Sequence, residues 1–261
     1  MKNEMKTVFS IMSKPKSVLV TGATSGVGYA LSIRLLVEGY EVWATGRSLA
    51  ILEKLRLEGA QVIPADLTKK EDIGQLITRI GSPDAVIFSA GIGTFSFAHE
   101  TSDEEIQSMM SVNVIAPMQL TKLLLPGMRE RRSGHLIYIG SQAGKVATPK
   151  ASVYAASKHA IIGYTNALRM EVASFGIQVT TINPGPIDTP FLDLADETGD
   201  YRTSLGRHLL TVEVVTDAVM NTLGKSIRDV NLPWYMGITS KLYAVAPTVI
   251  ERLGRKYFMK K

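Results

Sequence analysis

Two side chains within one short segment could together transfer a proton. Tyr154 and Lys158 are four residues apart, so in a helix they lie one turn from each other on the same face. A tyrosine side chain has a pKa of about 10, and a neighbouring ammonium lowers that pKa by favouring the phenolate. Lowering it to about 7 takes roughly 4 kcal/mol, which predicts a partly closed cleft of low dielectric and a second positive charge from a cofactor.

A hydroxyl at the end of an apolar run could complete this chemistry. Ser141 follows residues 135–140, which are typical of a buried strand. Open α/β sheets bind their ligands at the carboxyl ends of strands, so a substrate is expected beside this serine. Taken alone, a Tyr and a Lys at this spacing also occur on solvated helices, and a serine after a strand is often a turn or cap residue. The other motifs of the chain are needed to choose between a catalytic and a structural role for these residues.

A glycine-rich turn lies between a predicted strand and a predicted helix near the start of the chain. Residues 17–21 are β-branched and apolar, and residues 22–28 follow with glycines in the pattern Gly-x-x-x-Gly-x-Gly. Val27, Leu31 and Leu35 then repeat every four residues, which predicts a helix with one buried face that ends at Gly39. Glycines and the free N–H groups of a helix N-terminus bind phosphate, so this turn predicts an anion site.

Composition narrows the function classes. The 261 residues alternate strand and helix patterns, which predicts one α/β domain. There is no cysteine, and the four histidines lack metal-ligand spacing, so we expect no disulfide, thiolate nucleophile or metal site. The net charge is +5, and the basic residues are concentrated near the two ends of the chain, where no nucleic-acid-binding motif is found. No apolar segment is long enough to span a membrane. A cytoplasmic enzyme that binds no nucleic acid is the expectation.

Four separated motifs in this order resemble the short-chain dehydrogenase/reductase family. They are residues 21–28 (Thr-Gly-Ala-Thr-Ser-Gly-Val-Gly), Asn113, Ser141 and the segment from Tyr154 to Lys158, and the likeness runs from about residue 16 to 190. The resemblance implies a single Rossmann-type domain with a doubly wound parallel sheet of about seven strands. It also implies a homo-dimer or tetramer acting on a small carbonyl or alcohol substrate.

The resemblance also divides the chain. We expect an extension at residues 1–16, a catalytic domain at 17–234 that includes a substrate lid at 191–210, and a basic amphipathic segment at 235–261. Within the lid, residues 193–207 are polar and long for a loop, which predicts a mobile segment. Residues 229–234 are expected to form the closing strand.

The loop after the second strand selects the cofactor. Residues 41–45 lead to Gly46 and Arg47, and no acid is present to accept from a ribose 2′-hydroxyl. An arginine suits a 2′-phosphate, which favours NADP(H), while NAD(H) stays open as an alternative.

The resemblance assigns further cofactor contacts to turns along the chain. Asp66 is expected to accept from the adenine amino group with Leu67 against the ring, and Ile187 and Thr189 to contact the nicotinamide carboxamide. Phe88 and Ser89 stand where most relatives carry two asparagines, which removes amides that brace the sheet. The residues expected to hold the cofactor are Gly22, Thr24, Ser25, Gly26, Val27, Gly28, Arg47, Asp66, Leu67, Ala90, Gly91, Tyr154, Lys158, Pro184, Gly185, Ile187 and Thr189.

The catalytic roles follow from the charge that develops on a carbonyl oxygen when it receives a hydride. We expect Tyr154 to donate the proton, Lys158 to lower its pKa and bind the nicotinamide ribose, and Ser141 to orient the substrate. Asn113 falls inside a helical pattern over residues 103–131, where a buried asparagine is unfavourable unless its amide is used. The resemblance implies that it bends the helix slightly and holds a water that relays protons to the lysine.

The end of the chain admits three interpretations. Residues 240–258 form a basic amphipathic pattern that could contact a membrane surface, cover an acyl chain or pack in a dimer. Packing against protein is favoured, and membrane contact is the less favoured alternative.

Together these features predict an NADPH-dependent reductase of a ketone or aldehyde. The alternatives are an NAD-dependent alcohol dehydrogenase of the same fold and, less favoured, a dinucleotide-binding sensor without turnover. A pure binder has no physical need for an acid such as Tyr154, which argues against the sensor.

Overall fold

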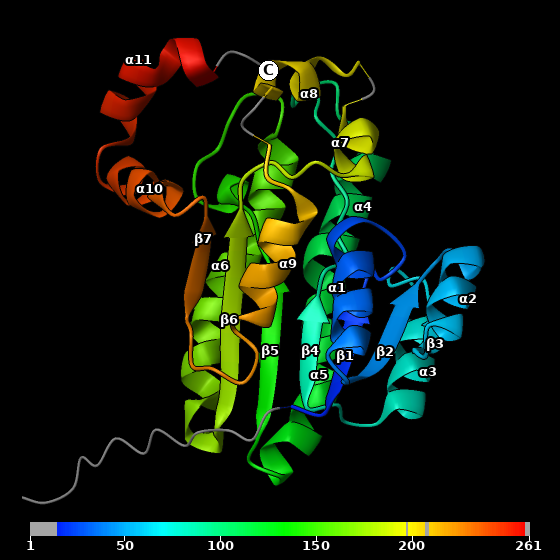
Figure 1. Cartoon of the computed structure of the whole chain (residues 1–261). Helices are drawn as coiled ribbons and strands as arrows, with labels where there is room; N and C mark the ends of the chain where they lie inside the picture. The colour runs from blue at the N-terminus through cyan, green and yellow to red at the C-terminus, as the bar shows by residue number, and fades with distance from the viewer. Residues whose placement is uncertain (1–14, 197, 207–208, 259–261) are drawn as a thin grey trace, which may run out of the picture.

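The computed structural model describes residues 15–196, 198–206 and 209–258, so most of the predicted extension at 1–16 lies outside the described residues. One parallel sheet of seven strands forms the centre, in the order β3-β2-β1-β4-β5-β6-β7. The predicted Rossmann-type doubly wound sheet is thereby confirmed (Figure 1). The strands are β1 Ser17–Thr21, β2 Glu41–Gly46, β3 Gln61–Pro64, β4 Ala85–Phe88, β5 Gly134–Ile139, β6 Ile177–Pro184 and β7 Asp229–Leu232.

Helices cover both faces of the sheet, which is why the central strands are apolar on both sides. Leu31 and Leu35 pack with Val215 on one face, and Leu120 and Leu168 pack on the other. The helices are α1 Gly26–Val37, α2 Leu49–Leu57, α3 Lys70–Ile80, α4 Asp103–Met110, α5 Ala116–Glu130, α6 Ser152–Val172, α7 Pro190–Ala195, α8 Asp200–Leu205, α9 Val212–Met220, α10 Tyr235–Val245 and α11 Pro247–Phe258.

The strand order reverses between β1 and β4, and this reversal opens a crevice at the carboxyl ends of the strands. The glycine turn after β1, the loop after β4 and the segment after β6 all reach this edge, and Ser141 follows β5 there. The fold therefore gathers the predicted motifs at one place although the sequence separates them widely.

Two predicted segments differ in detail from the structure. Residues 103–131 form two helices joined by a π-helical turn at Ser111–Ile115, a sharper irregularity than the slight bend expected at Asn113. Residues 193–207 are not a continuous loop as expected, because α7 and α8 occupy much of their described part; that they form a mobile substrate lid stays a prediction. Arg202 fixes these short helices through ion pairs with Asp188 at 2.7 Å and Asp193 at 3.0 Å.

The end of the chain is also more structured than predicted. Strand β7 stops at Leu232, a cis peptide bond precedes Pro233, and Trp234 is the cap of α10 instead of a strand residue. The single amphipathic segment expected over 240–258 is two helices, α10 and α11, which meet at Ala246. Within the described part of the chain, no helix combines the length and apolar character needed to cross a bilayer.

Candidate active site

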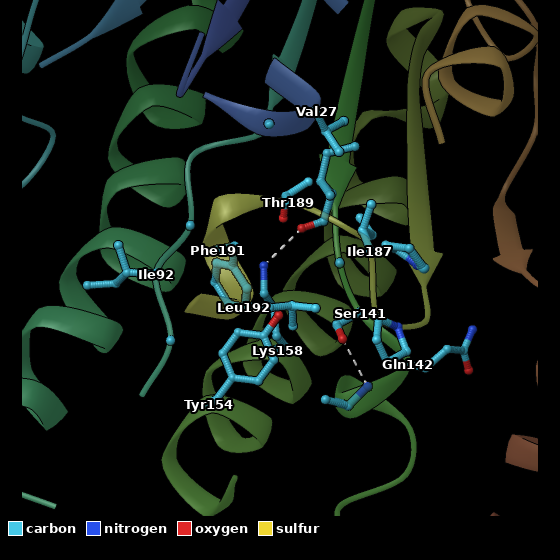
Figure 2. A pocket seen from close by; sticks show the side chains of 18 of the residues that line it. Val27, Ile92, Ser141, Gln142, Tyr154, Lys158, Ile187, Thr189, Phe191 and Leu192 are labelled. Atoms are coloured by element: carbon cyan, nitrogen blue, oxygen red, sulfur yellow. Dashed lines mark hydrogen bonds between the residues drawn. The ribbon is translucent and has the colours of Figure 1, made fainter. Parts of the chain in front are cut away.

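A cavity of about 850 Å³ opens at the carboxyl ends of the strands, between the glycine turn and α6, α7 and α10. Figure 2 shows the part of it around Tyr154, Lys158 and Phe191. Ser141 borders it, whereas Gly28 and Asn113 lie behind its wall. The residues predicted to hold a cofactor that border it are Gly22, Thr24, Ser25, Gly26, Val27, Arg47, Asp66, Leu67, Ala90, Gly91, Tyr154, Lys158, Pro184, Gly185, Ile187 and Thr189.

The glycine turn has the close backbone approach that a dinucleotide needs. A Cβ at Gly22, which has a φ of +66°, would lie 2.7 Å from the Cα of Ala90. A Cβ at Gly28 would lie 2.2 Å from the carbonyl oxygen of Gly22. Ser25, the N-cap of α1, makes no side-chain cap bond to the first-turn N–H groups. Together with the helix dipole, this cradle fits the diphosphate of a dinucleotide.

The adenosine end of the cavity carries one positive and one negative side chain. Arg47 borders the cavity directly after β2, and Asp66 borders it after β3. Backbone hydrogen bonding from Thr68 lowers the pKa of the Asp66 carboxyl, and the charge of Arg47 adds to this effect. Asp66 is therefore a carboxylate acceptor, and Arg47 is a cation placed for a phosphate.

The proton-transfer groups come from the loop directly after β5 and from the first turns of α6. The Oγ of Ser141 accepts a hydrogen bond from the N–H of Ala143 at 3.0 Å. The ammonium of Lys158 donates to the carbonyl of Ile139 at 3.0 Å and lies 5.8 Å from the centre of the Tyr154 ring. Figure 2 shows Tyr154 and Lys158 projecting from α6 into the same part of the cavity.

Burial controls the ionisation of both groups in the protein without a cofactor. It raises the pKa of Tyr154 to about 12, against the lowering effect of the hydrogen bond with Ser141. It lowers the pKa of Lys158 to about 8. Removal of water from the phenolate therefore dominates in this state, and the pKa of the tyrosine is not brought toward neutrality. The expected second positive charge from a cofactor stays a prediction.

Asn113 holds the loop after β4, which borders the cavity, in place through hydrogen bonds. Its Oδ1 accepts from the N–H of Ile92 at 2.9 Å, and its Nδ2 donates to the carbonyl of Ile92 at 2.8 Å and to the Oγ of Ser157 at 3.0 Å. A Cβ built at Gly91 would lie 3.4 Å from this Oδ1 and 3.5 Å from the Nζ of Lys158. The amide is thus used by the protein itself, and it faces the same point as the lysine.

A threonine braces the turn where the expected amides are missing. The Oγ1 of Thr21 accepts from the N–H groups of Ser89 and Ala90, each at 3.2 Å. Phe88 stacks on Tyr138 with ring centres 4.4 Å apart. Sequence reasoning missed this brace, although a threonine directly before the first glycine was its available signal.

Sequence reasoning also missed the aromatic wall around Tyr154. Phe95 and Phe191 lie with ring centres 5.8 Å and 5.6 Å from that of Tyr154, and Tyr201 lies 5.0 Å from Phe95. All three border the cavity. No local pattern marks them, because each alone is typical of an ordinary core aromatic. Among the described residues, no three His, Asp or Glu side chains gather as metal ligands would.

The amino-acid sequence is similar to those of known dehydrogenases and oxidoreductases. The family model described as short chain dehydrogenase matches residues 16–199. An uncharacterized oxidoreductase of Staphylococcus aureus strain MW2 is 35% identical over 216 residues, which cover 80% of this chain and 90% of the relative.

Two solved structures that share the fold are complexes with a nicotinamide cofactor. A serine dehydrogenase complexed with NADP+ superposes with a TM-score of 0.76 and 29% identity, over 82% of this chain and 93% of that one. An actinorhodin polyketide ketoreductase with NADPH superposes with a TM-score of 0.73 and 27% identity, over 85% and 97%. The family match, the sheet order and these likenesses lead to one conclusion: the chain belongs to the short-chain dehydrogenase/reductase family and is an NAD(P)-dependent oxidoreductase.

Proposed function

We propose that the protein is an NADPH-dependent reductase of a ketone or aldehyde. One observation carries the proposal: a phenol, a hydroxyl and an ammonium from Tyr154, Ser141 and Lys158 border the same cavity as the glycine turn. A bound nicotinamide would supply a hydride to a carbonyl carbon there. The negative charge that then grows on the carbonyl oxygen needs donors that are already in place.

Each side chain has a distinct task in this proposal. The hydroxyl of Tyr154 gives its proton to the carbonyl oxygen, so that one hydride and one proton convert the carbonyl to an alcohol. The hydroxyl of Ser141 donates a hydrogen bond to the same oxygen and orients it. The ammonium of Lys158 stabilises the phenolate that remains and would bind the nicotinamide ribose. Its bond to the Ile139 carbonyl holds the side chain against β5.

Asn113 acts as a positioning residue in this proposal. Its paired hydrogen bonds to Ile92 hold the loop after β4, and its bond to Ser157 ties that loop to the helix of Tyr154 and Lys158. A water at the point that Asn113 and Lys158 both face would carry a proton to the lysine.

The proposed preference for NADPH rests on Arg47. It is the cation at the adenosine end, and no acid stands beside it in its loop. The serine dehydrogenase and the ketoreductase, whose structures are complexes with NADP+ and NADPH, support the same choice. A cytoplasmic homo-dimer or tetramer remains our prediction for location and assembly.

The test is the Tyr154→Phe variant, assayed for NADPH oxidation against a panel of ketones and aldehydes. Removing only the phenolic oxygen is expected to lower kcat by about 10²–10⁴-fold, the typical contribution of general acid catalysis. The affinity for NADPH, read from fluorescence titration, should stay within about threefold. Tyr164→Phe is the matched control, because Tyr164 lies on the same helix but packs against Tyr138 outside the described cavity lining. Full turnover by Tyr154→Phe would contradict the proposal.

A further inference from the structure

The described lining of the cavity separates into a charged part and an uncharged part. Its only charged side chains are Arg47, Asp66 and Lys158, and all three belong to the part assigned to the cofactor. The remainder, beyond Tyr154, is bordered by apolar, aromatic and neutral polar side chains. A substrate there would meet no charged side chain among the described lining residues.

An aromatic wall begins this uncharged part at the reacting group. Phe95 and Phe191 meet each other edge to face with ring centres 6.4 Å apart, and both contact the Tyr154 ring. Gly93 allows this packing, because a Cβ there would lie 2.7 Å from Phe191 and 3.0 Å from Tyr154. The carbonyl of a substrate at Tyr154 would therefore sit beside aromatic faces.

The wall continues away from Tyr154 toward the end of the chain. It is formed by residues of α7, α8, α10 and α11, so a substrate that follows it is an extended one. The apolar and aromatic members from these helices are Leu192, Leu194, Tyr201, Leu205, Tyr235, Met236, Tyr243 and Ile250.

Two described cations close to this part of the cavity already have partners. Arg202 pairs with Asp188 and Asp193 and donates to the Thr189 carbonyl. Lys150 lies 5.4 Å above the ring of Phe97, and it borders a small separate pocket together with Asp196 on the far side of Phe95 and Tyr201. A carboxylate or phosphate on the substrate would lose its water in this part of the cavity without gaining a counter-charge, which costs several kcal/mol.

We propose that the substrate is an uncharged carbonyl compound with an extended apolar chain. Its carbonyl lies between Ser141 and Tyr154, and its chain follows the apolar wall toward α10 and α11. This inference rests on the proposed reductase function and names the substrate class of the same site.

The test is a homologous series of methyl ketones from butan-2-one to decan-2-one, with chain-matched analogues that end in a carboxylate or an ammonium. The kcat/KM for the neutral series is expected to rise by up to about fourfold per methylene until the wall is filled. Both charged analogues of decan-2-one should be at least about tenfold poorer substrates than decan-2-one. A flat series, or a charged analogue that is preferred, would overturn the inference while leaving the reductase function intact.

A charge placed in the wall sharpens the test. Leu205→Asp should lower kcat/KM for decan-2-one by about tenfold or more and raise it for the ammonium analogue. Phe97→Asp is the matched control, because Phe97 lies outside the described lining. If NADPH binds but no carbonyl compound is reduced, the proposed function itself fails.

A second inference rests on a separate surface, the C-terminal arm, which we define as α10 and α11. Figure 1 shows the arm projecting from the body beside β7. Several of its large apolar side chains are exposed, with Val245 at 86% and Leu253 at 81%. Ile238, Leu242 and Val245 recur at helical spacing on α10, and Val249 and Leu253 recur on α11.

The same segment carries the net charge of the protein. Residues 235–261 contain six basic residues and one acidic residue, a surplus equal to the formal net charge of +5 of the whole chain. The single acid, Glu251, accepts a hydrogen bond from Tyr243 at 2.7 Å. By helical spacing, Lys241 and Arg252 flank the exposed apolar residues of their helices, each three residues after one of them, Ile238 and Val249. The rest of the chain is formally neutral.

We infer that the C-terminal arm binds an anionic lipid surface. Exposed apolar side chains interleaved with cations are the pattern of helices that lie in the membrane interface. A second copy of the chain is the weaker occupant, because two arms would bring like charges together. The arm also borders the apolar end of the cavity, so a membrane-bound protein would present that end to lipid.

Co-sedimentation with vesicles tests this inference directly. The protein should bind vesicles of phosphatidylglycerol and phosphatidylcholine at least about tenfold more tightly than vesicles of phosphatidylcholine alone, and salt should weaken the difference. Leu242→Asp with Leu253→Asp should abolish binding, whereas Leu57→Asp on the exposed face of α2 should not. Equal affinity for both vesicles, or loss of self-association in the double variant without any lipid binding, would overturn it.

Discussion

Lys158→Met tests how much the ammonium contributes to the ionisation of Tyr154. The Nζ of Lys158 lies 5.8 Å from the centre of the tyrosine ring. At an effective dielectric constant of about 20, Coulomb's law gives about 3 kcal/mol at this distance, or about two pKa units on the phenol. Removing the charge should therefore reduce the phenolate fraction at neutral pH by about a hundredfold.

The pH dependence gives this prediction its sign. Oxidation of an alcohol uses the phenolate as the base, so the variant should be slower by about a hundredfold below pH 8. Burial lowers the pKa of Lys158 to about 8, so the wild-type ammonium loses its proton as the pH rises through that value. The ratio of wild-type to variant rate should then fall toward one between about pH 8 and 10.

The assay is single-turnover alcohol oxidation at saturating NADP+, which separates the chemical step from any loss of ribose binding. Lys145→Met is the matched control, because its ammonium donates to Asn231 at 2.8 Å and lies outside the described cavity lining. A ratio that stays constant from pH 6.5 to 10, or one below about threefold at neutral pH, would refute the electrostatic reasoning.

Three further perturbations follow from the same geometry. Arg47→Ala should raise the Kd for NADPH by about tenfold to a hundredfold and change the Kd for NADH little, because charged hydrogen bonds contribute about 1.5–3 kcal/mol. Equal losses of affinity for both cofactors, or a preference of the wild-type protein for NADH, would favour an NAD-dependent enzyme. Arg56→Ala on the exposed side of α2 is the control. Gly28→Ala places a Cβ 2.2 Å from a backbone oxygen of the glycine turn and should lower both the melting temperature and the affinity for NADPH. In Gly163→Ala, on α6, the added Cβ meets nothing within 4 Å, so this variant should raise the melting temperature. Similar effects of the two substitutions would contradict the close packing of the turn. Burial lowers the pKa of His135 to about 4, so as the pH falls below about 6.5 this histidine takes up a proton in the unfolded chain before it does so in the folded protein. The free energy of unfolding should therefore decrease by about 3 kcal/mol by pH 4. Urea titrations that show no such decrease, or the same decrease in His135→Gln, would refute this prediction.

The sequence by itself determined the features that depend on local backbone chemistry. Glycines at 22, 26 and 28 between an apolar strand and a helix have few other uses, and the structure places this turn against Ala90 at distances only glycine allows. The spacing of Tyr154 and Lys158 defines one helical face wherever the helix lies. The sheet was predictable for the same reason, since apolar runs alternating with amphipathic helices admit few topologies.

Tertiary structure alone decided the features that join distant residues. The Thr21 brace, the three bonds of Asn113 and the aromatic wall of Phe95, Phe191 and Tyr201 each join segments from different parts of the chain. The pKa of Tyr154 rises for the same reason, because burial depends on every element that covers the cavity, whereas spacing reports only one neighbour. Local spacing thus specified which groups could react, and long-range packing set their solvation, their supports and the shape of the space they face.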